Sequence, residues 1–152
     1  MMALMLLIGI VAGLRALTPL AAVSWAAHFG LVPVPGTWLV FLAATITPYL
    51  ATVLALGELV TDKMPTTQSR KMPIAFGARI LTGSLCGGTL GVASGLSFLG
   101  FFLGGIGAVI GTFGGAALRS RLAQAFGKDL PAALLEDVVA IATAVLIVCN
   151  VA

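Results

Sequence analysis

The chain has 152 residues, of which 60% are hydrophobic and only 9% carry a charge, and its mean hydropathy is +1.16. A soluble globular domain is typically about 45–50% apolar and about 25% charged, so this composition excludes an ordinary soluble domain and a disordered chain. A net charge of +3 from eight basic and five acidic residues also excludes nucleic-acid binding through a basic surface. An integral membrane protein remains, and the lipid bilayer is its first expected partner.

Charged residues divide the sequence into long apolar runs. No Asp, Glu, Lys or Arg occurs in residues 1–14, 16–57, 80–118 or 138–152, and Arg15 stands alone between the first two runs. A membrane-crossing helix needs about 20 apolar residues, so each of the two longest runs, of about 40 residues, fits two helices joined by a turn. Glycines and prolines at 30–36 mark the first turn, and a weaker break near Ser97–Gly100 marks the second.

These runs predict an all-helical integral membrane protein that forms one membrane domain over residues 1–152. Five membrane-spanning helices are expected, at roughly 2–28, 37–58, 73–97, 99–119 and 132–151. Met1–Leu14 has a second interpretation, as a separate half-helix that breaks at Gly13, because 14 residues reach only about 21 Å.

The basic residues predict how the helices are oriented. Except for Arg15, every Lys and Arg lies in the two charged segments, and short loops rich in these residues stay in the cytoplasm. We therefore expect an inner (cytoplasmic) membrane protein with its N-terminus in the cytoplasm and its C-terminus outside. The polar segment Pro65–Met72 is a plain connector or a contact for lipid headgroups or a cytoplasmic partner.

A six-residue motif occurs twice, at residues 13–18 and 77–82, as Gly-Leu-Arg-Ala-Leu-Thr and Gly-Ala-Arg-Ile-Leu-Thr. Each copy opens an apolar run that ends in a charged segment with a proline. The pattern predicts two parallel helical-hairpin repeats, at about 13–65 and 77–131, followed by a C-terminal helix at about 132–151. Parallel repeats occur in transporters, with sites at the repeat interface, but a duplicated hairpin without a transport role explains the pattern equally well.

Glycines recur at every fourth residue in the second long run, which places them on one face of a helix. Small residues let two helix backbones approach closely in lipid, where no hydrophobic effect drives helices together. Packing within the chain, packing between subunits and a glycine-lined pore all remain open, and we expect a homo-oligomer because five helices offer few internal partners. The predicted helix-packing residues are Gly83, Gly87, Gly91, Gly95, Gly107, Gly111 and Gly115.

Arg15 is the most informative candidate site residue, because an arginine at mid-membrane costs about 2.5–3.5 kcal/mol unless it is paired, hydrated or at a helix break. Arg79 is its counterpart in the second motif. One interpretation is a polar cavity, open to the cytoplasm, that binds an anion at the arginines or relays protons through the acids; the other is a set of structural ion pairs. The candidate ion- or substrate-site residues are Arg15, Thr18, Glu58, Asp62, Lys63, Arg79, Glu136 and Asp137.

Several polar motifs occur in order within this apolar sequence, and together they resemble a known family. They are Gly13-Leu14-Arg15-Ala16-Leu17-Thr18-Pro19-Leu20, Gly57-Glu58-Leu59-Val60-Thr61-Asp62-Lys63-Met64-Pro65 with Ser69-Arg70 after it, Gly77-Ala78-Arg79, and Leu130-Pro131 followed by Glu136-Asp137. In this order they resemble the bacterial membrane family called domain of unknown function 4126, over nearly the whole chain. The resemblance implies a multi-pass inner-membrane protein and brings no assigned activity.

The expected function is a small transporter or channel for an ion or small solute, with a polar site between the repeats. The alternative is a structural or accessory membrane protein whose buried charges serve packing and topology. An enzyme is disfavoured because the chain has one histidine, no Cys/His cluster and no nucleophile-plus-base pattern. We expect no catalytic residue, no cofactor, no metal ligands and no nucleic-acid partner, and the sequence names no particular solute.

Overall fold

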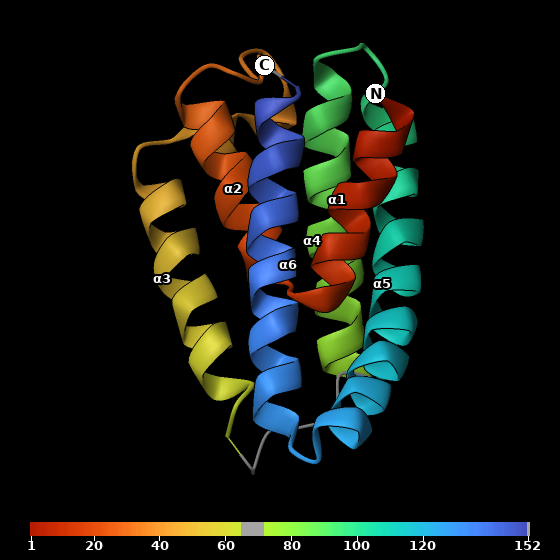
Figure 1. Ribbon diagram of the computed structural model, residues 1–152. Helices are drawn as coiled ribbons and strands as arrows, with labels where there is room; N and C mark the ends of the chain where they lie inside the picture. The colour runs from red at the N-terminus through yellow and green to blue at the C-terminus, as the bar shows by residue number, and fades with distance from the viewer. Residues whose placement is uncertain (65–71, 152) are drawn as a thin grey trace.

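The computed structural model describes residues 1–64 and 72–151 and consists of helices and the loops that connect them (Figure 1). The helices are α1 (Met2–Leu14), α2 (Leu17–His28), the 3-10 helix η1 (Trp38–Ala43), α3 (Ile46–Thr61), α4 (Pro73–Val92), α5 (Ser97–Phe126) and α6 (Asp129–Cys149). The described residues contain no strand, which confirms the all-helical class. Two of these helices, α5 and α6, are long and apolar enough to cross a membrane; five crossings and the two repeats stay predictions. Of the segment Pro65–Met72, only Met72 is among the described residues.

The first predicted helix, at 2–28, is in fact two helices. α1 ends at Leu14, and Arg15 follows in an extended conformation with φ −137° and ψ 113°. α2 begins at Leu17, so the interpretation of a separate half-helix holds, with the break two residues after Gly13. Pro19 favours this break because it has no N–H to donate to the Arg15 carbonyl in a continuous helix, whereas in the first turn of α2 that N–H is not needed.

The two helices form a hairpin and not a single rod. Figure 1 shows α1 running from the upper end towards the lower end and α2 returning to the upper end. Both termini therefore lie at the same end of the bundle; the side of the membrane on which each terminus lies stays a prediction. The hairpin stops short of the lower end of the bundle, because its tip lies beside Arg79 and Asp137. Arg79 comes six residues after the start of α4, and Asp137 comes eight residues after the start of α6. These offsets correspond to about 9–12 Å along a helix.

Other helix boundaries differ from the predicted ones by a few residues. The helix expected at 37–58 is divided into η1 and α3, and α5 extends beyond residue 119 to Phe126. The helix expected at 73–97 ends at Val92, and Gly95 forms the following turn with φ +68°, a conformation that favours glycine. The expected break near Ser97–Gly100 thus comes earlier, and Gly95 does not continue the glycine row of α4.

Helix α5 packs closely against α4 and α1 through glycines. A Cβ atom built on Gly83 of α4 would lie only 2.8 Å from the Gly104 carbonyl oxygen and 2.8 Å from Ala108 Cβ. Gly87 faces Gly100 and Gly104 in the same way, and Gly91 faces Leu96 and Ser97. On α5, a Cβ at Gly107 or Gly111 would meet the backbone of α1 near Ile10, while Gly115 is buried further along α5. These glycines therefore join helices of one chain.

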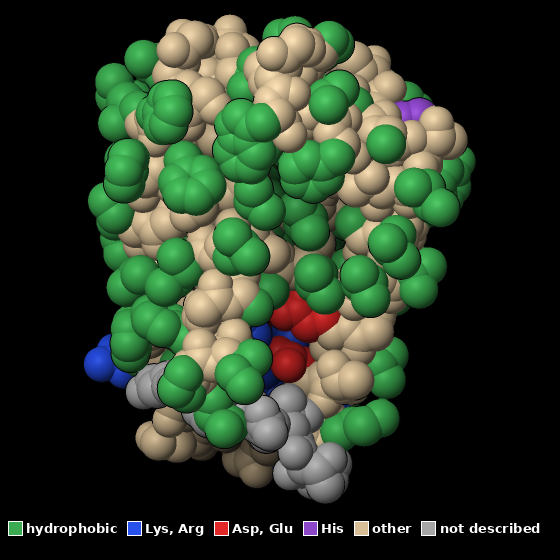
Figure 2. Space-filling model, turned by 180° about the vertical axis from the view of Figure 1, so that it is seen from behind, with side chains coloured by type: hydrophobic (Ala, Val, Ile, Leu, Met, Phe, Trp, Pro, Cys, Tyr) green, Lys and Arg blue, Asp and Glu red, His purple; other side chains and the backbone are tan. Residues whose placement is uncertain are grey.

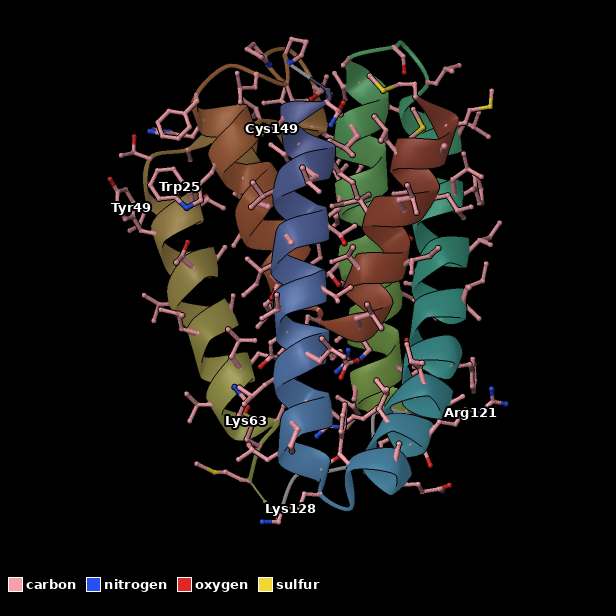
Figure 3. All side chains as sticks on the ribbon, viewed as in Figure 1. Trp25, Tyr49, Lys63, Arg121, Lys128 and Cys149 are labelled. Carbon is pink, nitrogen blue, oxygen red and sulfur yellow. The ribbon has the colours of Figure 1, made fainter. Side chains whose placement is uncertain are left out.

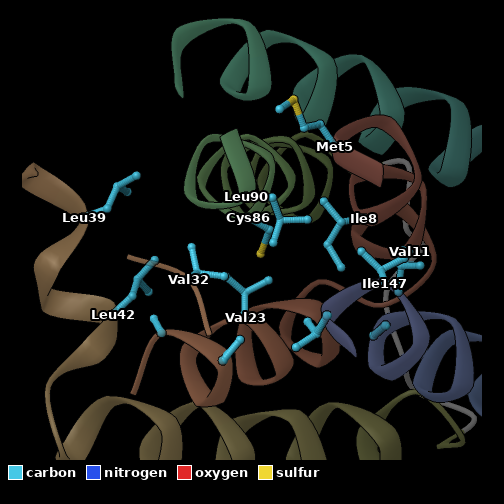
Figure 4. Close-up of a cluster of buried hydrophobic side chains, with 14 of the residues drawn as sticks. Met5, Ile8, Val11, Val23, Val32, Leu39, Leu42, Cys86, Leu90 and Ile147 are labelled. Carbon is cyan, nitrogen blue, oxygen red and sulfur yellow. The ribbon is translucent and has the colours of Figure 1, made fainter. Parts of the chain in front are cut away.

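An apolar cluster fills the space between the hairpin and the longer helices (Figure 4). Its buried members come from both arms of the hairpin, from α4 and α6 and from the loop before α3; they include Met5, Ile8, Val11, Val23, Val32, Cys86, Leu90 and Ile147. The cluster holds both arms of the hairpin in place, because each arm buries side chains in it.

Helix α3 is attached to the rest of the bundle by a small apolar contact. Only Pro48, Ala51 and Ala55 are buried along its length, and the two alanines pack on Ala21 of α2. The large apolar side chains of α3 are exposed on its outer side, with Val53 at 65%. The charged residues near the end of α3 therefore have a large part in holding it.

Replacing Gly104 by alanine is expected to lower the free energy of unfolding by about 1–3 kcal/mol, because the new methyl group would collide with the Gly83 carbonyl of α4. Gly114 on the same helix is the matched control, since a Cβ there meets nothing within 4 Å. Gly114→Ala should raise stability by up to about 1 kcal/mol, the difference in helix propensity. Denaturant unfolding of both variants, followed by circular dichroism, checks the difference; equal stabilities would contradict close packing at Gly104.

Candidate functional site

Charged side chains from four helices, α3 to α6, and from the hairpin tip form one cluster, here called the tip cluster. It lies towards the end of the bundle that is drawn lowest in Figure 1. Among the described residues it contains all five acidic residues of the chain and four of the six basic residues. Its members are Arg15, Glu58, Asp62, Lys63, Arg79, Arg119, Asp129, Glu136 and Asp137. Arg121 and Lys128 lie at the same end but point outward (Figure 3).

Arg15 lies at the centre of the tip cluster and is 0% exposed. Its guanidinium forms an ion pair through Nη1 with Asp62 at the end of α3, and another through Nη2 with Asp137 of α6. The second carboxylate oxygen of Asp137 lies 2.8 Å from Lys63 Nζ. The extended backbone at Arg15 is what directs its side chain between α3 and α6, so the break in the hairpin and this ion-pair network depend on each other.

Two side chains bind the backbone groups that the break leaves without helical partners. Glu58 of α3 accepts hydrogen bonds from both the Ala16 and the Leu17 backbone N–H, each at 2.8 Å. Its carboxylate thus lies at the N-terminus of α2, where the helix dipole favours negative charge. An unpaired buried N–H costs free energy comparable to a lost hydrogen bond, so Glu58 makes the start of α2 stable in this apolar interior.

Arg79 of α4 does the same for the end of α1. It donates hydrogen bonds to the Gly13 carbonyl at 3.0 Å and to the Leu14 carbonyl at 2.7 Å. A cation at a helix C-terminus is the favourable complement of the helix dipole. Arg79 Nη2 also lies 3.6 Å from Glu58 Oε1, so the two side chains that complete the hairpin form an ion pair with each other.

The outer part of the tip cluster is built around Arg119 of α5. Arg119 donates to both carboxylate oxygens of Asp129, at 2.9 and 2.6 Å, and lies 3.7 Å from Glu136. The adjacent acids Glu136 and Asp137 point in different directions along α6, so they serve different arginines. Sequence reasoning did not select Arg119, although its place in the same charged segment as Asp129 and Glu136 was a signal that could have found it.

Among the described residues, the formal charges of the covered carboxylates and of the cations that pair with them balance. The side chains of Glu58, Asp62, Glu136 and Asp137 are 7–12% exposed, whereas that of Asp129 is 62% exposed. The four covered carboxylates thus face four cations. Of the sequence-predicted site residues, the structure brings seven together here; the eighth, Thr18, lies one turn further along α2.

Among the described residues, the hollow beside the tip cluster is lined by Arg79 and not by Arg15, so a cavity lined by both arginines and open to the cytoplasm stays a prediction. A hollow of about 360 Å³ lies between α3 and α4, and Glu58 and Arg79 line it together with Leu17, Thr61 and Thr82. Figure 2 shows acidic side chains at the floor of a hollow on this face. Arg15 is fully buried, and Glu136 lines a small cleft between α5 and α6.

This arrangement defines an apolar helical bundle that encloses a broken helical hairpin, with ion pairs from the surrounding helices completing the break. Comparison with known families agrees with the resemblance noted in the sequence. The family model described as a domain of unknown function, DUF4126, matches residues 2–150, and the chain belongs to this family. No curated protein and no solved structure matches the chain.

Replacing Arg15 by methionine is expected to lower the free energy of unfolding by about 3–5 kcal/mol, because Asp62 and Asp137 would keep buried charges without their main partner. Unfolding of the purified protein in detergent measures this loss. Arg121→Met is the control, since Arg121 is exposed and outside the cluster, and its effect should stay within about 0.5 kcal/mol. Adding Asp62→Asn and Asp137→Asn should recover part of the loss; no recovery would contradict the pairing.

Proposed function

We propose that the chain is an integral protein of the inner (cytoplasmic) membrane that moves a small anion, with the start of α2 as the anion site. Large apolar side chains are exposed along α3, α5 and α6, as expected for surfaces that face lipid. The exposed basic residues Arg121 and Lys128 lie at the end of the bundle that holds the tip cluster, and the positive-inside rule assigns this end to the cytoplasm. In this arrangement α3 to α6 cross the bilayer, and the α1–α2 hairpin enters it from the outside.

The observation that carries the proposal is the position of the Glu58 carboxylate. It accepts two backbone N–H groups at a helix N-terminus, at 2.8 Å each, beside the Arg79 guanidinium at 3.6 Å. Backbone N–H groups at a helix start and an arginine are the donors that bind free carboxylates and phosphates. Broken helices in transporters direct their N-termini at anionic substrate groups. Glu58 therefore acts as a tethered anion that fills the site.

The weak attachment of α3 supports an opening movement. Glu58, Asp62 and Lys63 all belong to α3 or its end, and α3 buries only three residues. If α3 moves outward, two carboxylates and one ammonium leave the site together. Arg15, Arg79 and Asp137 remain on the bundle with a formal charge of +1, beside the freed N–H groups of α2. A small anion then replaces Glu58, and the structure described here is the closed form.

A second candidate function is structural, and one observation favours it. Arg15 is fully buried between two carboxylates, and the covered charges of the described residues balance without a ligand. In that case Glu58 and Arg79 serve only to complete the hairpin, and the protein is an accessory component of the membrane.

Chemical rescue tests the anion site directly. Glu58→Ala should lower the melting temperature, and acetate should restore several degrees of it by binding in place of the lost carboxylate. Acetamide, which is neutral and similar in shape, should not. Glu136→Ala is the matched control because its carboxylate touches no backbone N–H of α2 among the described hydrogen bonds, so acetate should leave it unchanged. Equal responses of both variants to acetate would contradict a specific site.

Anion movement is tested in liposomes that contain the purified protein. Efflux of chloride, acetate and phosphate should be several-fold faster with Glu58→Ala than with the natural chain, since the tethered anion no longer competes. Arg79→Met should remove this efflux in either background. No efflux of any of the three anions with the folded natural chain and folded Glu58→Ala would overturn the transport proposal and leave the structural function.

A further inference from the structure

A second groove lies on the other side of α3, between α2, α3 and α6, with a volume of about 310 Å³. Alanines and aliphatic side chains form most of its lining, and Thr18, Trp25 and Thr52 are its polar members. This groove shares no lining residue with the hollow beside Glu58. No charged side chain lines it in the part of the chain that the structure describes, so it suits an uncharged molecule. Its volume lies within the range of small-molecule sites, about 300–1,000 Å³.

Thr18 has a buried hydroxyl without a hydrogen-bond partner among the described residues. The residue is only 8% exposed. Threonines within the other helices donate to the carbonyl one turn earlier, as Thr52 does to Pro48 at 2.7 Å and Thr89 does to Leu85 at 2.7 Å. Thr18 is the second residue of α2, and the preceding turn is not helical.

The break in the hairpin thus explains why this hydroxyl has no acceptor among the described residues. The residue four positions before Thr18 is Leu14, which is the last residue of α1 and whose carbonyl accepts a hydrogen bond from Arg79 at 2.7 Å. A buried hydroxyl left without a partner costs about 1–3 kcal/mol. A ligand that brings an acceptor into the groove recovers this free energy.

The other polar groups of the groove bind each other. Trp25 Nε1 donates to Thr52 Oγ1 at 3.0 Å, and Thr52 Oγ1 donates to the Pro48 carbonyl at 2.7 Å. Trp25 lies near the upper end of α2, beside Tyr49 of α3 (Figure 3). Seven residues of α2, or about 10 Å, separate Trp25 from Thr18. The groove therefore has a hydrogen-bond donor at one end and an aromatic ring at the other.

We propose that this groove binds a neutral, lipid-soluble small molecule that carries a carbonyl or a similar hydrogen-bond acceptor. Its acceptor binds the Thr18 hydroxyl, and its apolar body lies along Ala22, Leu56 and Ile141 towards Trp25. Residues of α2, α3 and α6 line the groove, so in the proposed membrane arrangement a ligand dissolved in the lipid would enter it between α3 and α6.

Two probes of matched length test the proposal, 2-undecanone and n-undecane. In a Trp38→Phe background Trp25 is the sole tryptophan, and its emission reports occupancy of the groove in lipid nanodiscs. The ketone should bind saturably and about fivefold more tightly than the alkane, the contribution of one hydrogen bond. Thr18→Val, which removes the hydroxyl and keeps the shape, should abolish this preference and leave alkane binding unchanged.

Two further variants make the result specific. Thr18→Ser keeps the hydroxyl and should keep the preference for the ketone. Thr89→Val changes a buried threonine in α4 that does not line the groove, and it should leave the preference unchanged. Without a ligand, Thr18→Val should be at least as stable as the natural chain, because it removes an unpaired hydroxyl. Absence of a saturable response to either probe, or a preference that survives in Thr18→Val, would overturn the proposal.

Discussion

Backbone polar groups at the tip of a broken hairpin impose the constraint on which the rest of this structure depends. The tip exposes the N–H groups of Ala16 and Leu17 and the carbonyls of Gly13 and Leu14 to an apolar interior. Glu58 and Arg79 bind these four groups, each with the charge that the helix end favours. The positions of α3 and α4 follow from this, because each helix must present one charged side chain at the level of the tip.

Packing on the two sides of the hairpin differs in kind. On the side of α1, glycines bring the backbones of α1, α4 and α5 into close contact, so this part has little room for movement. On the side of α2, α3 is held by a few small residues and by charged side chains near its end. Both grooves described above lie beside α3. Room for a ligand thus exists on the side where small side chains meet a loosely held helix.

Much of this could be predicted from the sequence, and the reasons are local. The apolar runs predict the helical class, and the four-residue spacing of the glycines predicts the close contacts of α4 and α5. An arginine in an apolar segment has a high free-energy cost, which indicates that Arg15 is paired or lies at a helix break. In the structure it is paired with two carboxylates and also lies at a helix break. The reversal of direction after Arg15 could not be predicted, because it depends on Glu58 and Arg79, 43 and 64 residues later. The missing partner of Thr18 follows from the same reversal.

The hairpin also has a consequence for how the protein is made. Synthesis runs from the N-terminus to the C-terminus, so the hairpin leaves the ribosome before the helices whose side chains bind its tip. Until residues 58 and 79 have been synthesised, nothing in the chain neutralises the tip, and the second carboxylate for Arg15 arrives only at Asp137. The hairpin is therefore completed only by helices that follow it in the chain, and until they are made the polar groups of its tip need other partners.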